Sequence, residues 1–154
     1  MRIAVINGPN LNLLGVREPS VYGTETLGDV ERRLQELARD LGVTLEFVQR
    51  NGEGELVEYI HGLRGRADAA IVNAGAYSHS SLAIRDALTG VAMPFVEVHI
   101  SNVYAREPER RHSMLAPAAV GVICGLGTFG YDLALRGLAA KLATRSGEGR
   151  VARV

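Results

Sequence analysis

Several features that mark particular classes of protein are scarce in this sequence of 154 residues. Its single cysteine, Cys124, has no partner for an internal disulfide, which is typical of a reducing compartment. No apolar run approaches the roughly 18 residues of a membrane span. The N-terminus also lacks the apolar core and cleavage site of a secretory signal. The sequence therefore predicts a reduced, soluble, cytoplasmic protein.

An excess of charge is also absent. Seventeen basic residues balance seventeen acidic ones, so the total charge provides no attraction to nucleic acid or to an anionic membrane. An anionic partner must therefore be recognised by local groups. Lysine is nearly missing, since Lys141 is the only lysine among the seventeen basic residues.

Familiar metal and phosphate motifs are missing as well. The four histidines are scattered along the chain, and no His-x-x-x-His spacing or second cysteine completes a ligand set. Asn7 and Asn73 follow the first and third apolar runs, where a phospho-receiver would need acidic residues. The run 125–130, GLGTFG, matches the dinucleotide fingerprint in form, but it lies in the last unit of the chain. We interpret these glycines as sites of close helix packing.

Short apolar runs alternate with segments of helical periodicity, a pattern typical of βαβ units and a parallel sheet. We expect strands at residues 2–6, 43–48, 69–72, 95–99 and 119–124, and helices at 26–41, 56–63, 81–88 and 131–142. Thr26 and Asp29 have the spacing of a capping box, and Gly42 ends that helix. The length suits one domain, which we place at residues 1–143, followed by a disordered tail at 144–154.

Polar residues gather where the predicted strands end. The four segments concerned are 7–12, 49–51, 73–79 and 99–110. In open parallel sheets, ligands bind outside the carboxyl ends of the strands, near the point where the strand order reverses. These segments therefore predict one crevice.

The loop from residue 7 to residue 23 is long for a compact α/β domain, in which links usually take about 2 to 6 residues. It is rich in hydrogen-bonding side chains, including Asn10, Arg17 and Tyr22, which favours a lid or binding loop. A phenol with its ordinary pKa of about 10 is a poor base, but a fixed guanidinium such as that of Arg17 favours the phenolate.

Glu97 and His99 are two residues apart on a predicted strand, so their side chains leave on the same face. The carboxylate could then orient or charge the imidazole, although an isolated ion pair at a strand end is the alternative. The polar residues that follow favour a functional site. Backbone amides at Ile100 and Ser101, together with a guanidinium such as that of Arg110, suit a carboxylate and hydroxyls on a small ligand.

His79 precedes a predicted helix, where backbone amides point toward a polar ligand. A histidine that only caps the helix is an equal alternative. Asp86 lies on the second turn of that helix and, taken alone, is typical of a surface carboxylate.

Taken together, these motifs resemble those of one family, the type II 3-dehydroquinate dehydratases. GPNLNLLG, REPSVYG, NGEGEL, NAGAYSHSSLAIRDA, EVHISNVYARE and GVICGLGTFGY occur in the family's order and spacing, and they cover nearly all of residues 3–135. The resemblance implies a flavodoxin-like fold, a three-layer α/β sandwich whose five-stranded parallel sheet has the order 2-1-3-4-5. It also implies a homododecamer built from trimers.

The activity that the resemblance implies is anti elimination of water from 3-dehydroquinate, through an enolate, to give 3-dehydroshikimate in the shikimate pathway. No cofactor and no metal are implied. Another known route to this reaction uses a lysine Schiff base, but Lys141 lies too far along the final helix for that role. The sequence therefore supports an acid–base route.

By the same resemblance, Tyr22 removes the proton beside the ketone, and Arg17 holds it as a phenolate. Ionising a phenol of pKa about 10 at pH 7 costs about 4 kcal/mol. A cation about 4 Å away at an effective dielectric constant near 20 supplies about that much. Asn10 would stabilise the enolate, and His99, supported by Glu97, would protonate the departing hydroxyl.

A second set of residues would bind the substrate's carboxylate and hydroxyls: Asn73, Gly75, His79, Ile100, Ser101 and Arg110. Asp86 would reach the site of a neighbouring subunit, and Arg106 would support Tyr22 or the lid. The chain departs from the family pattern at four positions: Arg50, Gly52, Tyr104 and Glu109. An acid at 109 could compete with substrate for Arg110, which leaves open a module that binds a cyclic carboxylate without turnover.

Overall fold

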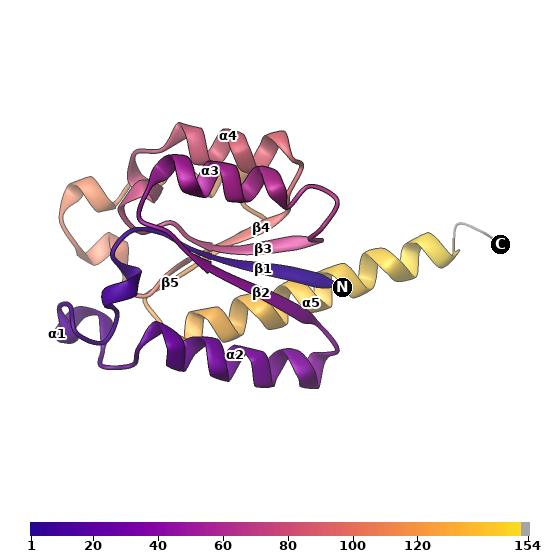
Figure 1. Ribbon diagram of the computed structural model, residues 1–154, viewed down its shortest axis with the longest axis horizontal. Helices are drawn as coiled ribbons and strands as arrows, with labels where there is room; N and C mark the ends of the chain where they lie inside the picture. The colour runs from indigo at the N-terminus through magenta and orange to yellow at the C-terminus, as the bar shows by residue number, and fades with distance from the viewer. Residues whose placement is uncertain (152–154) are drawn as a thin grey trace.

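The computed structural model describes the backbone of residues 1–151 and the side chains of residues 1–21 and 23–146. Five parallel strands form one sheet in the order β2-β1-β3-β4-β5, as Figure 1 shows. The strands are β1 (Arg2–Asn7), β2 (Thr44–Gln49), β3 (Ala69–Asn73), β4 (Phe95–His99) and β5 (Gly121–Cys124). The predicted strand order is confirmed, and each predicted strand lies within two residues of its observed bounds.

Helices cover both faces of this sheet (Figure 1). The longer helices are α2 (Leu27–Leu41), α3 (Glu53–Gly62), α4 (Leu82–Gly90) and α5 (Phe129–Val151), and α1 (Pro19–Tyr22) is a single turn in the first loop. Helices α2 and α5 pack on one face, and α3 and α4 pack on the other. The result is the three-layer sandwich that the sequence predicts.

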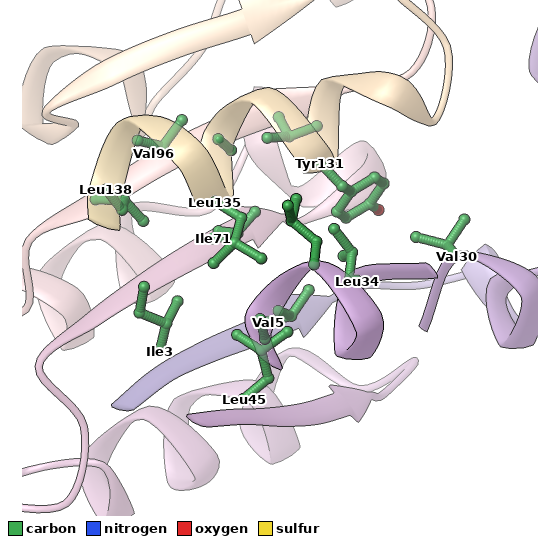
Figure 2. Packing of buried hydrophobic residues seen from close by; sticks show 14 of the residues in the cluster. Ile3, Val5, Val30, Leu34, Leu45, Ile71, Val96, Tyr131, Leu135 and Leu138 are labelled. Carbon is green, nitrogen blue, oxygen red and sulfur yellow. The ribbon is translucent and has the colours of Figure 1, made fainter. Parts of the chain in front are cut away.

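Each face of the sheet carries its own buried core. Because side chains alternate along a strand, Val5 and Ile71 pack toward α2 and α5, where they meet Leu34 and Leu135 (Figure 2). The intervening residues, such as Ile6, pack toward α3 and α4. Burial on both faces explains why the strands are continuous apolar runs rather than alternating ones.

Local signals determine where the helices begin and end. The hydroxyl of Thr26 accepts from the backbone N–H of Asp29 at 3.1 Å, and the Asp29 carboxylate accepts from the N–H of Thr26 at 3.0 Å, which confirms the capping box. Gly42 ends α2 with a φ of 69°, a conformation that glycine adopts at low cost. Ser81 caps α4 by accepting from the N–H of Ile84 at 3.0 Å.

The last helix is longer than the sequence predicts. The backbone stays helical through Val151, across residues 144–151 where the sequence predicts a disordered tail. Alanine, leucine, lysine and arginine, which favour helices, make up most of residues 138–145, and no proline interrupts them. Residues 152–154, the rest of that predicted tail, lie outside the described residues. No helix within the described part of the chain has the length and apolar character to cross a membrane.

Candidate active site

A pocket opens where β1, β3 and β4 end. The strand order reverses between β1 and β3, so this is the switch point at which parallel sheets bind ligands. The space between its walls, which includes open solvent, is about 530 Å³. Its walls consist of Pro9, Asn10, Leu11, Arg17, Asn73, Gly75, Ala76, His79, His99, Ile100, Ser101, Val103, Arg106 and Arg110.

Most of the predicted site residues meet in this pocket. Those that line it are Asn10, Arg17, Asn73, Gly75, His79, His99, Ile100, Ser101, Arg106 and Arg110. Glu97 lies directly behind His99. Asp86 is exposed on α4 and does not line the pocket. Tyr22 is the last residue of α1, and only its backbone is described.

The Glu97–His99 pair is buried and closely bonded, as predicted. Nε2 of His99 lies 2.6 Å from Oε1 of Glu97, and the Glu97 side chain is 0% exposed. The hydroxyl of Ser113 donates to the same Oε1 at 2.6 Å. Because Glu97 engages Nε2, Nδ1 is the nitrogen of His99 that remains for a ligand.

Ser113 can donate only toward Glu97. Its oxygen accepts from the backbone N–H groups of Leu115 at 3.1 Å and Ala116 at 3.0 Å, and its single proton is directed to the carboxylate. Oε2 of Glu97 has no hydrogen-bond partner among the described residues. The carboxylate is therefore held through Oε1 alone, between Ser113 and His99.

His79 presents a neutral imidazole to the pocket. Its Nδ1 lies 2.7 Å from the backbone carbonyl of His112, and because a carbonyl only accepts, Nδ1 carries the proton. Burial lowers the pKa of His79, the hydrogen bond to His112 opposes that change, and the neighbouring His99 and Arg110 lower it further. Nε2 is therefore an acceptor for a ligand hydroxyl at neutral pH. Ser81 caps α4, so the alternative of a capping histidine is wrong.

Two asparagine amides, one of them in the pocket wall, are joined through the Tyr131 hydroxyl. Asn7 and Asn73 are register partners at the ends of β1 and β3. The Tyr131 hydroxyl donates to Oδ1 of Asn7 at 2.6 Å and accepts from Nδ2 of Asn73 at 2.9 Å. Oδ1 of Asn73 accepts from the N–H of Gly75 at 3.2 Å. The orientation of the Asn73 amide is therefore determined at both ends.

Asn10 adopts the left-handed conformation, with a φ of 67°, which asparagine tolerates better than most residues. Oδ1 of Asn51 accepts from the Asn10 N–H at 3.0 Å and also from Nε2 of Gln49 at 3.0 Å. The hydroxyl of Tyr77 donates to the Asn51 carbonyl at 2.8 Å. The prediction that residues 49–51 line the crevice is wrong, because none of them is in the pocket wall; Asn51 instead bonds to the backbone of Asn10, which is.

Three guanidinium groups give the pocket a positive wall. Arg17 lies 3.6 Å from a Glu18 carboxylate oxygen, and Nη1 of Arg106 lies 3.5 Å from the Ser101 hydroxyl. Nε of Arg110 donates to the Glu107 carboxylate. Such a wall suits a ligand carboxylate.

From the sequence, Glu109 is the acid that could compete with a ligand for Arg110. In the structure, the carboxylate that accepts a hydrogen bond from Arg110 belongs to Glu107. Both carboxylates are exposed, and the hydrogen bond from Arg110 holds the pKa of Glu107 below its ordinary value. Glu107 is therefore a carboxylate with which a ligand would compete for Arg110.

No three His, Cys, Asp or Glu residues within the described part of the chain lie close enough together to hold a metal ion.

Sequence reasoning missed three residues that support the pocket wall. Tyr131 and Asn51 lie in motifs that are visible in the sequence, GVICGLGTFGY and NGEGEL, but their type does not reveal their partners. Ser113 lies in an irregular segment between short 3₁₀ turns and carries no periodic signal. The apolar lining residues Pro9, Leu11 and Val103 lie within the predicted segments 7–12 and 99–110, but the prediction named only polar side chains.

The fold and the pocket define a class of protein: a flavodoxin-like α/β sandwich whose switch-point site combines a buried imidazole–carboxylate pair, oriented amides and guanidiniums. Comparison with known proteins agrees with this class. The family model described as dehydroquinase class II matches residues 1–139. A 3-dehydroquinate dehydratase from Gemmatimonas aurantiaca is 60% identical over 142 residues, which are 92% of this chain and 93% of that protein.

Solved structures extend the likeness to three dimensions. The type II dehydroquinase from Butyrivibrio crossotus superposes with a TM-score of 0.88 at 41% identity, covering 90% of this chain and 97% of that one. The enzyme from Propionibacterium acnes gives 0.86 at 45% identity, covering 90% of this chain and 96% of the other. The chain belongs to the class II dehydroquinase family, as its sequence motifs predict.

Proposed function

We propose that the switch-point pocket is where this chain eliminates water from 3-dehydroquinate to give 3-dehydroshikimate. Family membership makes the protein a 3-dehydroquinate dehydratase, a hydro-lyase of the shikimate pathway. The main support for this pocket is the buried Glu97–His99 pair, because the His99 imidazole lines the same pocket as three arginines. A general acid beside an anion site is what loss of hydroxide from a cyclic carboxylate needs.

The first step is removal of a proton beside the ketone. We assign it to Tyr22 as a phenolate, with Arg17 as the cation that keeps it ionised. Support comes from the position of Arg17 in the pocket wall and from the short connection to α1, which ends at Tyr22. The C–H bond breaks, its proton passes to the phenolate oxygen, and its electron pair moves onto the ketone oxygen.

The second step is survival of the enolate. We assign its stabilisation to Asn10, directly or through a water molecule, as an oxyanion-hole donor. The hydrogen bond from its backbone to Asn51 supports this role, because a donor that is already oriented needs no reorganisation when charge develops.

The third step is departure of the hydroxyl. As the enolate collapses, the new carbon–carbon double bond forms and the carbon–oxygen bond breaks. A proton from His99 converts the leaving hydroxide to water. Glu97 stabilises the imidazolium that precedes this transfer, and its contacts with His99 and Ser113 support that role. Passage of a proton from Tyr22 back to His99 resets the site.

Substrate binding is assigned to groups whose position in the pocket wall fits the task. Arg110 pairs with the substrate carboxylate, with the backbone amides of Ile100 and Ser101 beside it. Asn73 and His79 bind hydroxyls, His79 through its Nε2. These contacts, together with Gly75, hold the ring in the pocket.

Further assignments concern the domain, its location and its assembly. Residues 1–143 form the catalytic domain, which acts in the cytoplasm. The assembly is a homododecamer of trimers, in which Asp86 reaches a neighbouring subunit's pocket and Arg106 supports Tyr22 or the lid. The exposure of Asp86 on α4 fits a contact with another subunit.

The test is the appearance of the conjugated enone carboxylate when purified protein meets 3-dehydroquinate, measured with and without a chelator. Turnover that resists the chelator supports the proposal. Binding measured by calorimetry without turnover would instead support a module that binds a cyclic carboxylate and does not catalyse a reaction. The hydrogen bond between Arg110 and Glu107 is the observation that favours this alternative.

A further inference from the structure

We infer that Tyr131 is a positioning residue that orients the Asn73 amide for ligand binding, through its hydroxyl rather than through packing. The inference rests on the proposed function, because it concerns how the pocket holds its substrate. It also assigns a task to the GVICGLGTFGY motif, whose glycines alone explain only helix packing.

The hydrogen bonds allow one orientation of the Asn73 amide. The Tyr131 hydroxyl has one proton, which goes to Oδ1 of Asn7, so toward Asn73 it can only accept. Nδ2 of Asn73 must therefore face Tyr131, and Oδ1 must face the N–H of Gly75. A flipped amide would set Nδ2 against the Gly75 N–H and lose both bonds. The second N–H of Asn73 is then left for a ligand acceptor.

The position of Tyr131 is itself fixed. Its side chain is 0% exposed and lies among the residues between the sheet and α2 and α5, as Figure 2 shows. The preceding Gly130 packs closely, because an added Cβ would lie 3.4 Å from both Ile123 and Val98. The following Asp132 accepts from Arg33 of α2 at 2.8 to 3.1 Å.

Packing alone does not require a tyrosine here. A phenylalanine ring would fill the same space, and burying a hydroxyl is unfavourable unless it is hydrogen-bonded. Burial raises the pKa of Tyr131, so its hydroxyl keeps its proton. The hydroxyl joins the ends of β1 and β3 at the switch point, where Asn7 and Asn73 are register partners. The contact thus links α5 to the pocket floor.

The test compares Tyr131→Phe with Tyr59→Phe. Tyr59 is the matched control, because its hydroxyl also donates to a side chain, Glu46, but it lies outside the pocket. We expect Tyr131→Phe to weaken 3-dehydroquinate binding about tenfold, in both KM and the calorimetric Kd, because one oriented donor is lost. Tyr59→Phe should leave both values unchanged. An unchanged Kd in Tyr131→Phe would overturn the inference.

A second comparison separates positioning from general loosening. In an Asn73→Ala background, Tyr131→Phe should produce no further loss of affinity, since the amide that it orients is gone. An equal further loss would show that Tyr131 acts through packing and would overturn the inference.

The double variant Asn7→Leu/Tyr131→Phe controls for misfolding of Tyr131→Phe. Tyr131→Phe leaves Oδ1 of Asn7 without its donor, and Asn7→Leu replaces that acceptor with an apolar side chain of similar shape, which limits the loss of stability. We expect this double variant to fold and to keep the tenfold weaker Kd. A return to wild-type affinity would contradict the inference. Wild-type binding without turnover would refute the proposed function, while the Kd values would still test the role of Tyr131.

Discussion

The imidazole rings of His79 and His99 stack in the pocket wall, with their centroids 5.9 Å apart and an angle of 19° between their planes. Their surroundings differ. His99 shares a buried hydrogen bond with Glu97, whereas His79 is bonded to a backbone carbonyl and has a lowered pKa. The stacked pair thus combines an imidazole supported by a carboxylate with a neutral one, which suits an acid and a hydroxyl acceptor.

The lowered pKa of His79 makes a prediction about stability and pH. Because its folded pKa lies below the unfolded value of 6.5, the unfolded state binds more protons between the two values. The contribution of neutral His79 is therefore present above pH 6.5 and is lost as the pH falls through the folded pKa. His79→Gln should lose less stability than wild type on acidification across this window, as measured by urea unfolding. His61→Gln, which removes an exposed histidine outside the pocket, is the control. A steeper acid loss in His79→Gln would contradict the assignment.

Ser113→Ala should impair catalysis more than binding. The variant removes one of the two donors to Oε1 of Glu97, a change of about 1 to 2 kcal/mol. We expect kcat to fall about tenfold with KM nearly unchanged, and Ser113→Thr to restore part of the rate. Ser146→Ala, which removes an exposed hydroxyl bonded to the Leu142 carbonyl, is the control. A rise in KM with kcat intact would assign Ser113 to binding instead.

Glu107→Gln should tighten substrate binding. The change removes the carboxylate that accepts from Arg110, so the guanidinium is more available to a substrate carboxylate. We expect KM to fall only about two- to fivefold, and only at low salt, because exposed ion pairs are weak and are screened by salt. Glu109→Gln, two residues away and also exposed, should change KM less. Equal effects of the two variants would mean that general charge, rather than the specific pair, determines KM.

Asn51→Ala should act on the pocket without touching the ligand. Oδ1 of Asn51 accepts from the backbone N–H of Asn10, which adopts the left-handed conformation. The variant removes this hydrogen bond. We expect a loss of about 1 to 2 kcal/mol in transition-state stabilisation, seen as a lower kcat/KM in steady-state kinetics. Asn12→Ala, in the same loop but outside the pocket, is the control. If kcat/KM is the same in wild type and Asn51→Ala, Asn10 does not depend on this support.

The framework was predictable because its signals are local. Apolar runs buried on both faces define the strands, and Thr26, Asp29 and Gly42 mark the ends of α2 through contacts with near neighbours. The pocket was predictable because parallel strands bring the polar residues at their carboxyl ends to one edge. Glu97 and His99 needed only the period of a strand.

The supporting residues depend on contacts between distant segments. Ser113 reaches Glu97 from an irregular segment, and Tyr131 reaches Asn7 across most of the chain. No period or cap in the sequence indicates such contacts. Likewise, the sequence places the segment 49–51 in the pocket lining, and only the structure shows that Asn51 lies outside the lining and accepts from the Asn10 N–H.

The assignment of Tyr22 as the base is tested most directly by following enone formation from 3-dehydroquinate in parallel for wild type, Tyr22→Phe and the control Tyr59→Phe. Removal of a general base typically costs about 10²- to 10⁴-fold in rate. We expect Tyr22→Phe to lose at least that much in kcat while still binding substrate, and Tyr59→Phe to keep the wild-type rate. A Tyr22→Phe variant that turns over like wild type would show that Tyr22 is not the base.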